Sequence, residues 1–288
     1  GNNGLGSKSV SRALHNFITL DYSGSAKYHR GDNLDFTSSI GLQYYHQDLN
    51  TITATGSNFP AIPITTVSGG TTRTGAETYT GNATVGVFGQ EEIAWRNRVF
   101  LTAALRGDDN SAFGKQFKAA YYPKFSGSWV IGEEPWFHVP FVNSLRLRAA
   151  YGASGTQPGA FDAAQLYAPS VGYADQPGLV PSAFGNPALR PELSKEIEMG
   201  FESTVLGGTT DISYTHYHRN ITDAIVNSPL PPSTGFPGSQ IVNIGRVTGW
   251  GNELAINTRL ITGDKFSWAV GTSYSKNGNR IEDMGGIP

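Results

Sequence analysis

Apolar residues recur at every second position along several segments of this chain, and polar or small residues fill the positions between them. Val99, Leu101 and Leu105 belong to one such series. Thr102 and Arg106 lie at the intervening positions of the same segment. A side-chain period of two is the period of a β-strand, so each segment is predicted to be a strand with one apolar and one polar face. The pattern leaves open whether the apolar face covers a protein core or meets lipid.

The connections between these segments favour lipid. Predicted strands of about 10 residues are joined alternately by short turns and by long segments rich in Gly, Ser, Thr and Pro, which is how a transmembrane barrel builds its two rims. Soluble β-sandwiches rarely show this asymmetry. The predicted fold class is therefore all-β, an antiparallel transmembrane β-barrel, and soluble all-β domains with long loops are the alternative.

About ten antiparallel strands are expected, with odd-numbered connections short and even-numbered connections mostly long. The strands are expected near residues 18–28, 36–45, 83–95, 99–106, 121–131, 145–151, 196–205, 212–224, 253–260 and 266–274. Residues 50–82 and 153–190 show no period and are expected to be long irregular connections. Connections of this length in a compact domain are usually functional loops.

Composition excludes several classes of protein. The 288 residues carry a formal net charge of −2, which argues against a nucleic-acid binder. The absence of cysteine excludes a disulfide framework and any Cys-ligated metal site. No apolar run approaches the roughly 20 residues that a membrane helix needs. The chain does not begin with Met and shows no signal peptide, so it is interpreted as a piece of a longer chain.

The motifs of catalysis are absent from the sequence, and no cofactor is expected. There is no G-x-S-x-G elbow, no H-E-x-x-H and no glycine-rich phosphate loop. His216 and His218 are two apart on a predicted strand and share a face, but a metal site would need a third ligand, so a wet barrel surface or rim is favoured. Asp108 and Asp109 could bind calcium, and a solvated loop tip is favoured over that reading.

Several short motifs occur in a fixed order over residues 85–277. They are RGDDNSAFG at 106–114, YPKFSGSW at 122–129, LRLRAAYGASG at 145–155, NPALRPE at 186–192, and Thr234-Gly235-Phe236 followed by NIGRV at 243–247 and GNEL at 251–254. Together they resemble the barrel of TonB-dependent outer-membrane transporters, in particular the SusC/RagA-like branch. Each motif alone is weak, and the five in order are fairly specific.

The resemblance implies that residues 1–288 are a fragment of a β-barrel domain of about 22 strands in the bacterial outer membrane. The plug domain and the segment that contacts the TonB complex have no counterpart here, so they would lie outside this chain. The implied function is TonB-driven import of a nutrient of the oligosaccharide or peptide class. Related transporters work with a surface lipoprotein lid of the SusD kind. The implied partners are the lipid bilayer, the TonB complex and such a lipoprotein.

Three sets of residues are candidates for function. The expected lumen-lining residues are Arg146, Arg148, Glu198, Glu202, Glu253 and Arg259. An aromatic girdle at the short-turn rim would consist of Trp95, Trp129, Trp136 and Trp268, and cross-strand packing would explain the same residues without a membrane. The candidates for substrate or partner contact in the second long connection are Phe161, Tyr167, Tyr173 and Phe184, which could equally pack the loop onto itself.

Two other functions fit an outer-membrane barrel. A small barrel enzyme of the protease or lipase type would suit ten strands, but it would need its own signal peptide and a terminal aromatic strand. A passive porin would lack a plug, which only sequence before this chain would decide. The transporter reading also predicts an open sheet, with no ladder of hydrogen bonds between residues 16–28 and 266–276, because neighbouring strands of the barrel would cover both edges.

Overall fold

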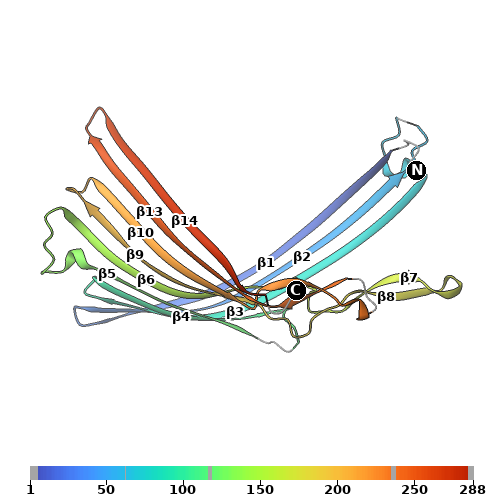
Figure 1. Ribbon diagram of the computed structural model, residues 1–288, viewed down its shortest axis with the longest axis horizontal. Helices are drawn as coiled ribbons and strands as arrows, with labels where there is room; N and C mark the ends of the chain where they lie inside the picture. Colours follow the sequence, from blue (N-terminus) through green and yellow to red (C-terminus); the bar gives the residue numbers. More distant parts are fainter. Residues whose placement is uncertain (1–5, 62, 116–118, 235–237, 285–288) are drawn as a thin grey trace. The chain divides into compact units, whose positions relative to one another are not determined.

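Alternating side chains and short turns assemble one large antiparallel sheet in the computed structural model, which describes residues 6–61, 63–115, 119–234 and 238–284. Its ten strands lie in the order β1-β2-β3-β4-β5-β6-β9-β10-β13-β14 (Figure 1). Their bounds are β1 Ser7–Arg30, β2 Leu34–Ser57, β3 Thr72–Trp95, β4 Val99–Asn110, β5 Ala120–Val130, β6 Val142–Thr156, β9 Glu192–Val205, β10 Thr210–Thr222, β13 Arg246–Thr262 and β14 Ser267–Asp283. The expected all-β sheet of ten strands is confirmed.

Two hairpins and four short 3-10 helices occupy the connections. The hairpins pair β7 (Leu166–Val171) with β8 (Pro177–Ala183), and β11 (Ile225–Pro229) with β12 (Ser239–Asn243). The 3-10 helices are η1 Val67–Gly69, η2 Ile131–Glu133, η3 Tyr173–Asp175 and η4 Pro232–Thr234. Among the described residues, no helix is long and apolar enough to cross a membrane. Residues Gly235 and Phe236 of the fifth motif lie outside the described part of the chain.

The chain divides into two compact units. Residues 1–21 and 43–85 form the first unit, and residues 22–42 and 86–288 form the second. The first unit holds the beginnings of β1 and β3 and the end of β2. The second unit holds the complete strands from β4 onward and therefore carries the candidate site.

The first unit corrects the expected connection at residues 50–82. β2 continues to Ser57 and β3 begins at Thr72, so both strands have 24 residues rather than about 10. The Thr-rich sequence suits a strand because threonine is β-branched. Cross-strand hydroxyl pairs join Ser9 to Thr55 at 3.0 Å and Ser11 to Thr53 at 3.1 Å, which ties β1 to this extension.

The short connections agree with the sequence. Gly207 and Gly208 have φ values of +66° and +84° in the turn between β9 and β10, a conformation that glycine adopts without steric cost. Because the strands are antiparallel, this turn shares one end of the sheet with the short β3–β4 and β13–β14 connections. The long connections, with both hairpins, therefore lie at the other end.

The densest packing lies among the long connections. Leu189 is completely buried, and Ala112 and Phe113 are nearly so. The amide of Gly114 donates to the carbonyl of Leu189 at 3.0 Å, and a Cβ on Gly114 would lie 2.3 Å from the carbonyl oxygen of Pro187. The residues 185–191, which we call the hub segment, thus meet the β4–β5 connection without room for a side chain.

Hydrogen bonds fasten the hub segment to the second hairpin. The Asn186 side chain donates to the carbonyl of Ile241 at 3.2 Å. The Arg190 guanidinium donates to Asp223 Oδ1 at 2.7 Å, and the Asn243 side chain donates to the Arg190 carbonyl at 2.7 Å. The irregular region expected at residues 153–190 is therefore wrong in part, because it contains a hairpin and a segment fixed by distant partners.

The pairing registers separate the two faces as the alternation predicts. Leu147 lies opposite Trp129 and Phe201, whereas Arg148 lies opposite Ser128 and Gly200. The same alternation places Leu101, Leu145, Leu254, Ile256 and Val270 on the face of Leu147. We call this the apolar face and the other the polar face. β1 and β14 are the two ends of the sheet order, as expected from the open-sheet prediction.

Candidate functional site: the charged polar face

The polar face gathers ionised side chains from three strands of the sheet. β6 contributes Arg146 and Arg148, β9 contributes Glu198 and Glu202, and β13 contributes Glu253. These are five of the six residues predicted to line a lumen, and the sheet brings them together on one face. The sixth, Arg259, shares the face but lies near the short-turn end, where its Nη2 donates to the carbonyl of Gly208 at 2.6 Å.

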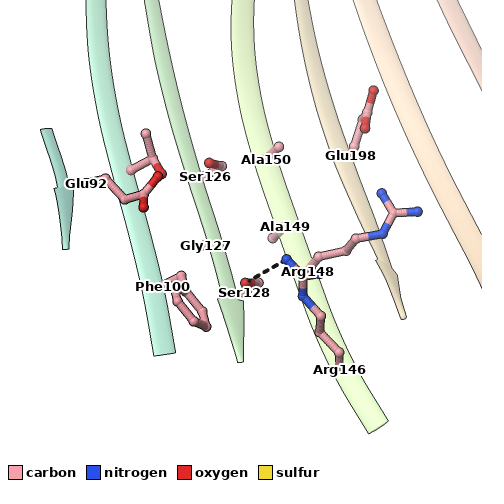
Figure 2. Close-up of a pocket in the computed structure, with 11 residues that line it drawn as sticks. Glu92, Phe100, Ser126, Gly127, Ser128, Arg146, Arg148, Ala149, Ala150 and Glu198 are labelled. Carbon is pink, nitrogen blue, oxygen red and sulfur yellow. Dashed lines mark hydrogen bonds between the residues drawn. The ribbon is translucent and has the colours of Figure 1, made fainter. Parts of the chain in front are cut away.

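Glu202 links the two arginines of β6. Its Oε2 lies 3.7 Å from Arg146 Nη1, and its Oε1 lies 3.4 Å from Arg148 Nε. The 3.4 Å contact is an ion pair without a hydrogen bond, because Arg148 Nε has no hydrogen-bond partner among the described residues. Arg146 Nη2 donates to Ser128 Oγ at 3.2 Å (Figure 2). Ion pairs this exposed contribute at most about 1 kcal/mol each to stability. Their main effect is to fix the positions of the charged side chains.

A glycine allows Arg148 to reach beyond its neighbouring strand. Arg148 lies opposite Gly200 on β9, and Gly200 lies opposite Thr215 on β10. Because Gly200 has no side chain, Arg148 Nη2 passes over it and donates to Thr215 Oγ1 at 2.6 Å. A Cβ on Gly200 would lie 2.3 Å from the Tyr214 carbonyl oxygen. Figure 2 shows the Arg148 side chain extended sideways from β6 across the sheet.

Two of the open pockets on this face are lined by Arg148. One of about 300 Å³ is drawn in Figure 2, and Arg146, Arg148, Ser128 and Glu198 are among its lining residues. The other, of about 340 Å³, is lined by Arg148, Glu196, Glu198, Thr215, Tyr217, Arg219 and Glu253. Guanidinium and carboxylate groups side by side can hydrogen-bond hydroxyls, amides and charged termini. The face therefore suits polar, hydrogen-bonding molecules.

Sequence reasoning missed four residues of the second pocket: Glu196, Thr215, Tyr217 and Arg219. Glu196 pairs with the Arg219 guanidinium across β9 and β10. The Tyr217 ring lies over Gly251, where a Cβ would be 2.6 Å from the ring. The sequence did contain a signal for two of them. Glu196 and Arg219 follow the same alternation that marked the residues predicted to line the lumen. Among the described residues, no group of three His, Asp or Glu side chains could hold a metal ion.

The tryptophans of the predicted girdle lie at the short-turn end. Trp95 is the last residue of β3, Trp129 is next to the end of β5, and Trp268 is the second residue of β14. Trp136 lies in the β5–β6 connection, with its ring 6.1 Å from that of Trp129. Trp129 Nε1 donates to Glu134 Oε1 at 3.0 Å. Their placement at a membrane interface stays a prediction.

The four loop aromatics do not form one cluster. Tyr167 lies in β7 and Tyr173 at the tip of the β7–β8 hairpin, where it is 97% exposed. Phe161 and Phe184 lie at the two ends of the hairpin's base. The tip is about 20 Å from the base, because β7 has six residues. The structure therefore offers an exposed tip and a separate base rather than one aromatic pocket.

The aspartates considered for calcium need a correction. The loop tip expected at Asp108 is wrong, because β4 continues to Asn110 and Asp108 is buried. Its two carboxylate oxygens accept from Arg106 Nε at 2.8 and 3.0 Å. Gly86 leaves the space for this pair, since a Cβ there would lie 2.3 Å from both side chains. The carboxylate is buried because the guanidinium pairs with it.

The histidine pair also needs a correction. His216 lies opposite Met199 and His218 lies opposite Ile197, so both histidines belong to the apolar face. The wet-surface half of the interpretation is therefore wrong, and the placement of the pair at a rim stays a prediction. His216 and His218 follow Ile212 and Tyr214 at every second position of β10, so they point to the same face as these residues.

Labelling of single cysteines tests the assignment of the two faces, since the chain has no cysteine. Ile212 and Ser213 are neighbours on β10 that point to opposite faces. We expect a water-soluble maleimide to modify Ser213→Cys and to leave Ile212→Cys unmodified in membranes, because lipid covers the apolar face. Equal labelling of both positions would contradict the assignment.

An open antiparallel sheet with one apolar and one charged face is the wall of a transmembrane barrel. Residues 2–287 match the model of the TonB dependent receptor-like, beta-barrel family. The chain belongs to this family of outer-membrane proteins.

Curated relatives place the chain near the SusC-like members. A TonB-dependent receptor of Formosa agariphila is 29% identical over 216 residues, which is 73% of this chain and 22% of that protein. The TonB-dependent receptor SusC of Bacteroides thetaiotaomicron is 28% identical over 217 residues, covering 72% of this chain and 22% of SusC. The chain thus spans about a fifth of the length of these relatives.

Solved structures confirm the fold. The RagAB peptide transporter matches with a TM-score of 0.87 at 20% identity, covering 98% of this chain and 32% of that chain. The outer membrane transporter YddB from Escherichia coli matches with a TM-score of 0.61 at 13% identity, covering 93% of this chain and 34% of that chain. In both matches the chain corresponds to part of a larger protein.

Proposed function

We propose that this chain is part of the wall of an outer-membrane transporter that imports a nutrient, with energy supplied through TonB. The observation that carries the proposal is the charged polar face, with Arg148 held across Gly200 to Thr215. A barrel wall with this face inside lines a lumen that is wet and rich in hydrogen-bonding groups. The membership of the TonB-dependent receptor family supports the energy source.

The substrate class that fits the polar face is an oligosaccharide or a peptide. Both carry many hydrogen-bonding groups, which suit the guanidinium and carboxylate groups of Arg148, Glu198 and Glu253. The similarity to the RagAB peptide transporter supports the peptide class. We propose that Arg146, Glu202 and Arg259 complete the lining of the lumen.

The connections at the long-loop end are proposed to contact substrate and a surface lipoprotein of the SusD kind. Tyr173 at the hairpin tip is almost fully exposed, as are large parts of Val171 and Leu179. Exposed aromatic and aliphatic side chains on one hairpin suit a binding surface. Tyr167 on β7 would extend this surface, and Phe161 and Phe184 would offer separate contacts at the base of the hairpin. TonB would be contacted by a part of the protein outside this chain.

Uptake by whole cells tests the proposal. Cells that express the protein from its whole reading frame would be given labelled oligosaccharides and labelled oligopeptides, in strains with and without TonB. We expect uptake of one class, its loss without TonB, and no uptake in a strain that lacks the gene. Uptake that persists without TonB would indicate a passive porin. Degradation of the substrate at the cell surface without uptake would indicate an enzyme.

A further inference from the structure

Polar and cationic side chains interrupt the apolar face near the long-connection end of β10, β13 and β14. His216 and His218 are exposed there beside Met199 and Ile197. His216 Nδ1 lies 3.0 Å from Asn252 Oδ1, which also accepts from the Tyr214 hydroxyl at 2.7 Å. This shared acceptor orients the His216 ring. No ion pair for His218 is recorded in the part of the chain that the structure describes.

A tryptophan and a lysine continue the same region on the next two strands. Trp250 lies opposite His218 on β10 and opposite Gly278 on β14. A Cβ on Gly278 would lie 2.9 Å from the Trp250 ring, so the absent side chain lets the indole lie over β14. Lys276 is exposed and lies opposite Asn252. We call His216, His218, Trp250 and Lys276 the cationic-aromatic patch.

The spacing along the strands gives the depth of this patch. Trp268 and Gly278 are ten positions apart on β14, or about 33 Å along the strand. A strand tilt near 40° reduces this to about 25 Å, which is the height of the apolar band of an outer-membrane barrel. Trp250, opposite Gly278, therefore lies at the upper edge of the band if Trp268 marks the lower edge. Aromatic side chains gather at both edges.

The basic side chains lie at or just inside that upper edge. Lys276 is eight positions from Trp268, or about 20 Å above the lower edge. His218 lies opposite Trp250 and therefore at the level of that residue. A lysine at this depth extends its stem along apolar surface and brings its ammonium group to the headgroups. β10 and β14 are two strand spacings apart, so the backbones that carry His218 and Lys276 lie about 10 Å from each other, with Trp250 on β13 between them.

We propose that the cationic-aromatic patch binds the phosphate groups of a diphosphorylated glycolipid in the membrane leaflet on the long-connection side. Lipid is the occupant because the patch belongs to the apolar face and lies within the height of the bilayer. Phosphate is the recognised group because Lys276 donates three hydrogen bonds and each histidine ring donates at least one. Two phosphates suit hydrogen-bond donors on both sides of Trp250.

Two charged neighbours of the patch, Arg280 and Glu282, lie on β14. Arg280 lies four positions beyond Lys276, but its Nε is 3.8 Å from Glu282 Oε1, and Thr248 also donates to this carboxylate at 2.9 Å. We therefore leave Arg280 out of the patch. The carboxylate of Glu282 lies farther from the band than Lys276 and leaves the ammonium group free to meet a phosphate.

Native mass spectrometry tests the proposal with the protein expressed from its whole reading frame and purified in detergent. The probes are diphosphorylated lipid A, the same lipid with one phosphate removed, and phosphatidylcholine. The test variant is the double substitution His218→Gln and Lys276→Gln. The matched control is His138→Gln with Lys265→Gln, which removes the same side chains from exposed connections at the short-turn end.

We expect the Kd for diphosphorylated lipid A to rise about tenfold in the patch variant, from the loss of charge-assisted hydrogen bonds, and to stay within about twofold in the control. Removal of one phosphate from the lipid should weaken binding to the unmodified protein, and this arm does not depend on the folding of a variant. Equal Kd values in the two double variants would overturn the proposal. Equal binding of all three lipids would also overturn the proposal. So would a dimer of the unmodified protein that dissociates in the patch variant.

Discussion

An arginine introduced at Ala149 should destabilise the protein by about 2 kcal/mol. Ala149 lies on the apolar face, opposite Gly127 and Met199. It is seven positions from Val142, the first residue of β6, and therefore within the apolar band. A guanidinium there must leave water or distort the bilayer. The measurement is unfolding by urea of the protein expressed from its whole reading frame and reconstituted in lipid vesicles.

The neighbouring residue supplies the control. Ala150 differs from Ala149 only in its face, because successive residues of a strand point to opposite sides. It lies opposite Ser126 and Glu198, so an arginine at position 150 can meet the Glu198 carboxylate. We expect Ala150→Arg to change the free energy of unfolding by less than about 0.5 kcal/mol. Equal destabilisation by the two substitutions would show that the faces are assigned wrongly.

Truncation of Leu189 should loosen the long connections. Leu189 is the largest side chain with no exposed surface, and deletion of a buried leucine to alanine costs about 3 kcal/mol. The amides of Gly114 and Leu189 donate within this cluster, to Leu189 and Asn186 respectively. Hydrogen exchange at these amides should become about 100-fold faster in Leu189→Ala.

Leu179 provides the matched comparison for this prediction. It is 71% exposed in β8, so its truncation removes few contacts. We expect Leu179→Ala to leave the exchange of the Gly114 and Leu189 amides unchanged. If both truncations accelerate exchange alike, the hub segment does not hold the connections together.

The faces of the sheet were predictable because the face of one residue determines the face of the next residue along the strand. Once Leu147 is assigned to the apolar face, the period of two assigns Arg146 and Arg148 to the other. The same reasoning would have placed His216 and His218 correctly from Tyr214. It failed there because residue type was allowed to outweigh parity, and histidine was treated as a residue for wet surfaces.

The rest of the site depends on pairings that alternation does not contain. The contact between Gly114 and Leu189 joins residues far apart in the sequence, and no local pattern marks it. The reach of Arg148 to Thr215 depends on the register that places Gly200 between them. The Thr-rich extension of β2 and β3 was missed because threonine and glycine are common both in loops and in strands.

The hub segment separates the parts of this molecule that can change from those that cannot. The β7–β8 hairpin ends at Ala183, immediately before residues 185–191, and Asn243 at the end of β12 is fastened to Arg190. Each hairpin is therefore anchored at its base. A protein engineer could lengthen, shorten or exchange either hairpin beyond its anchor without disturbing the wall below. New ligand preferences would then arise by grafting hairpins from other proteins, while the membrane-spanning strands stay unchanged.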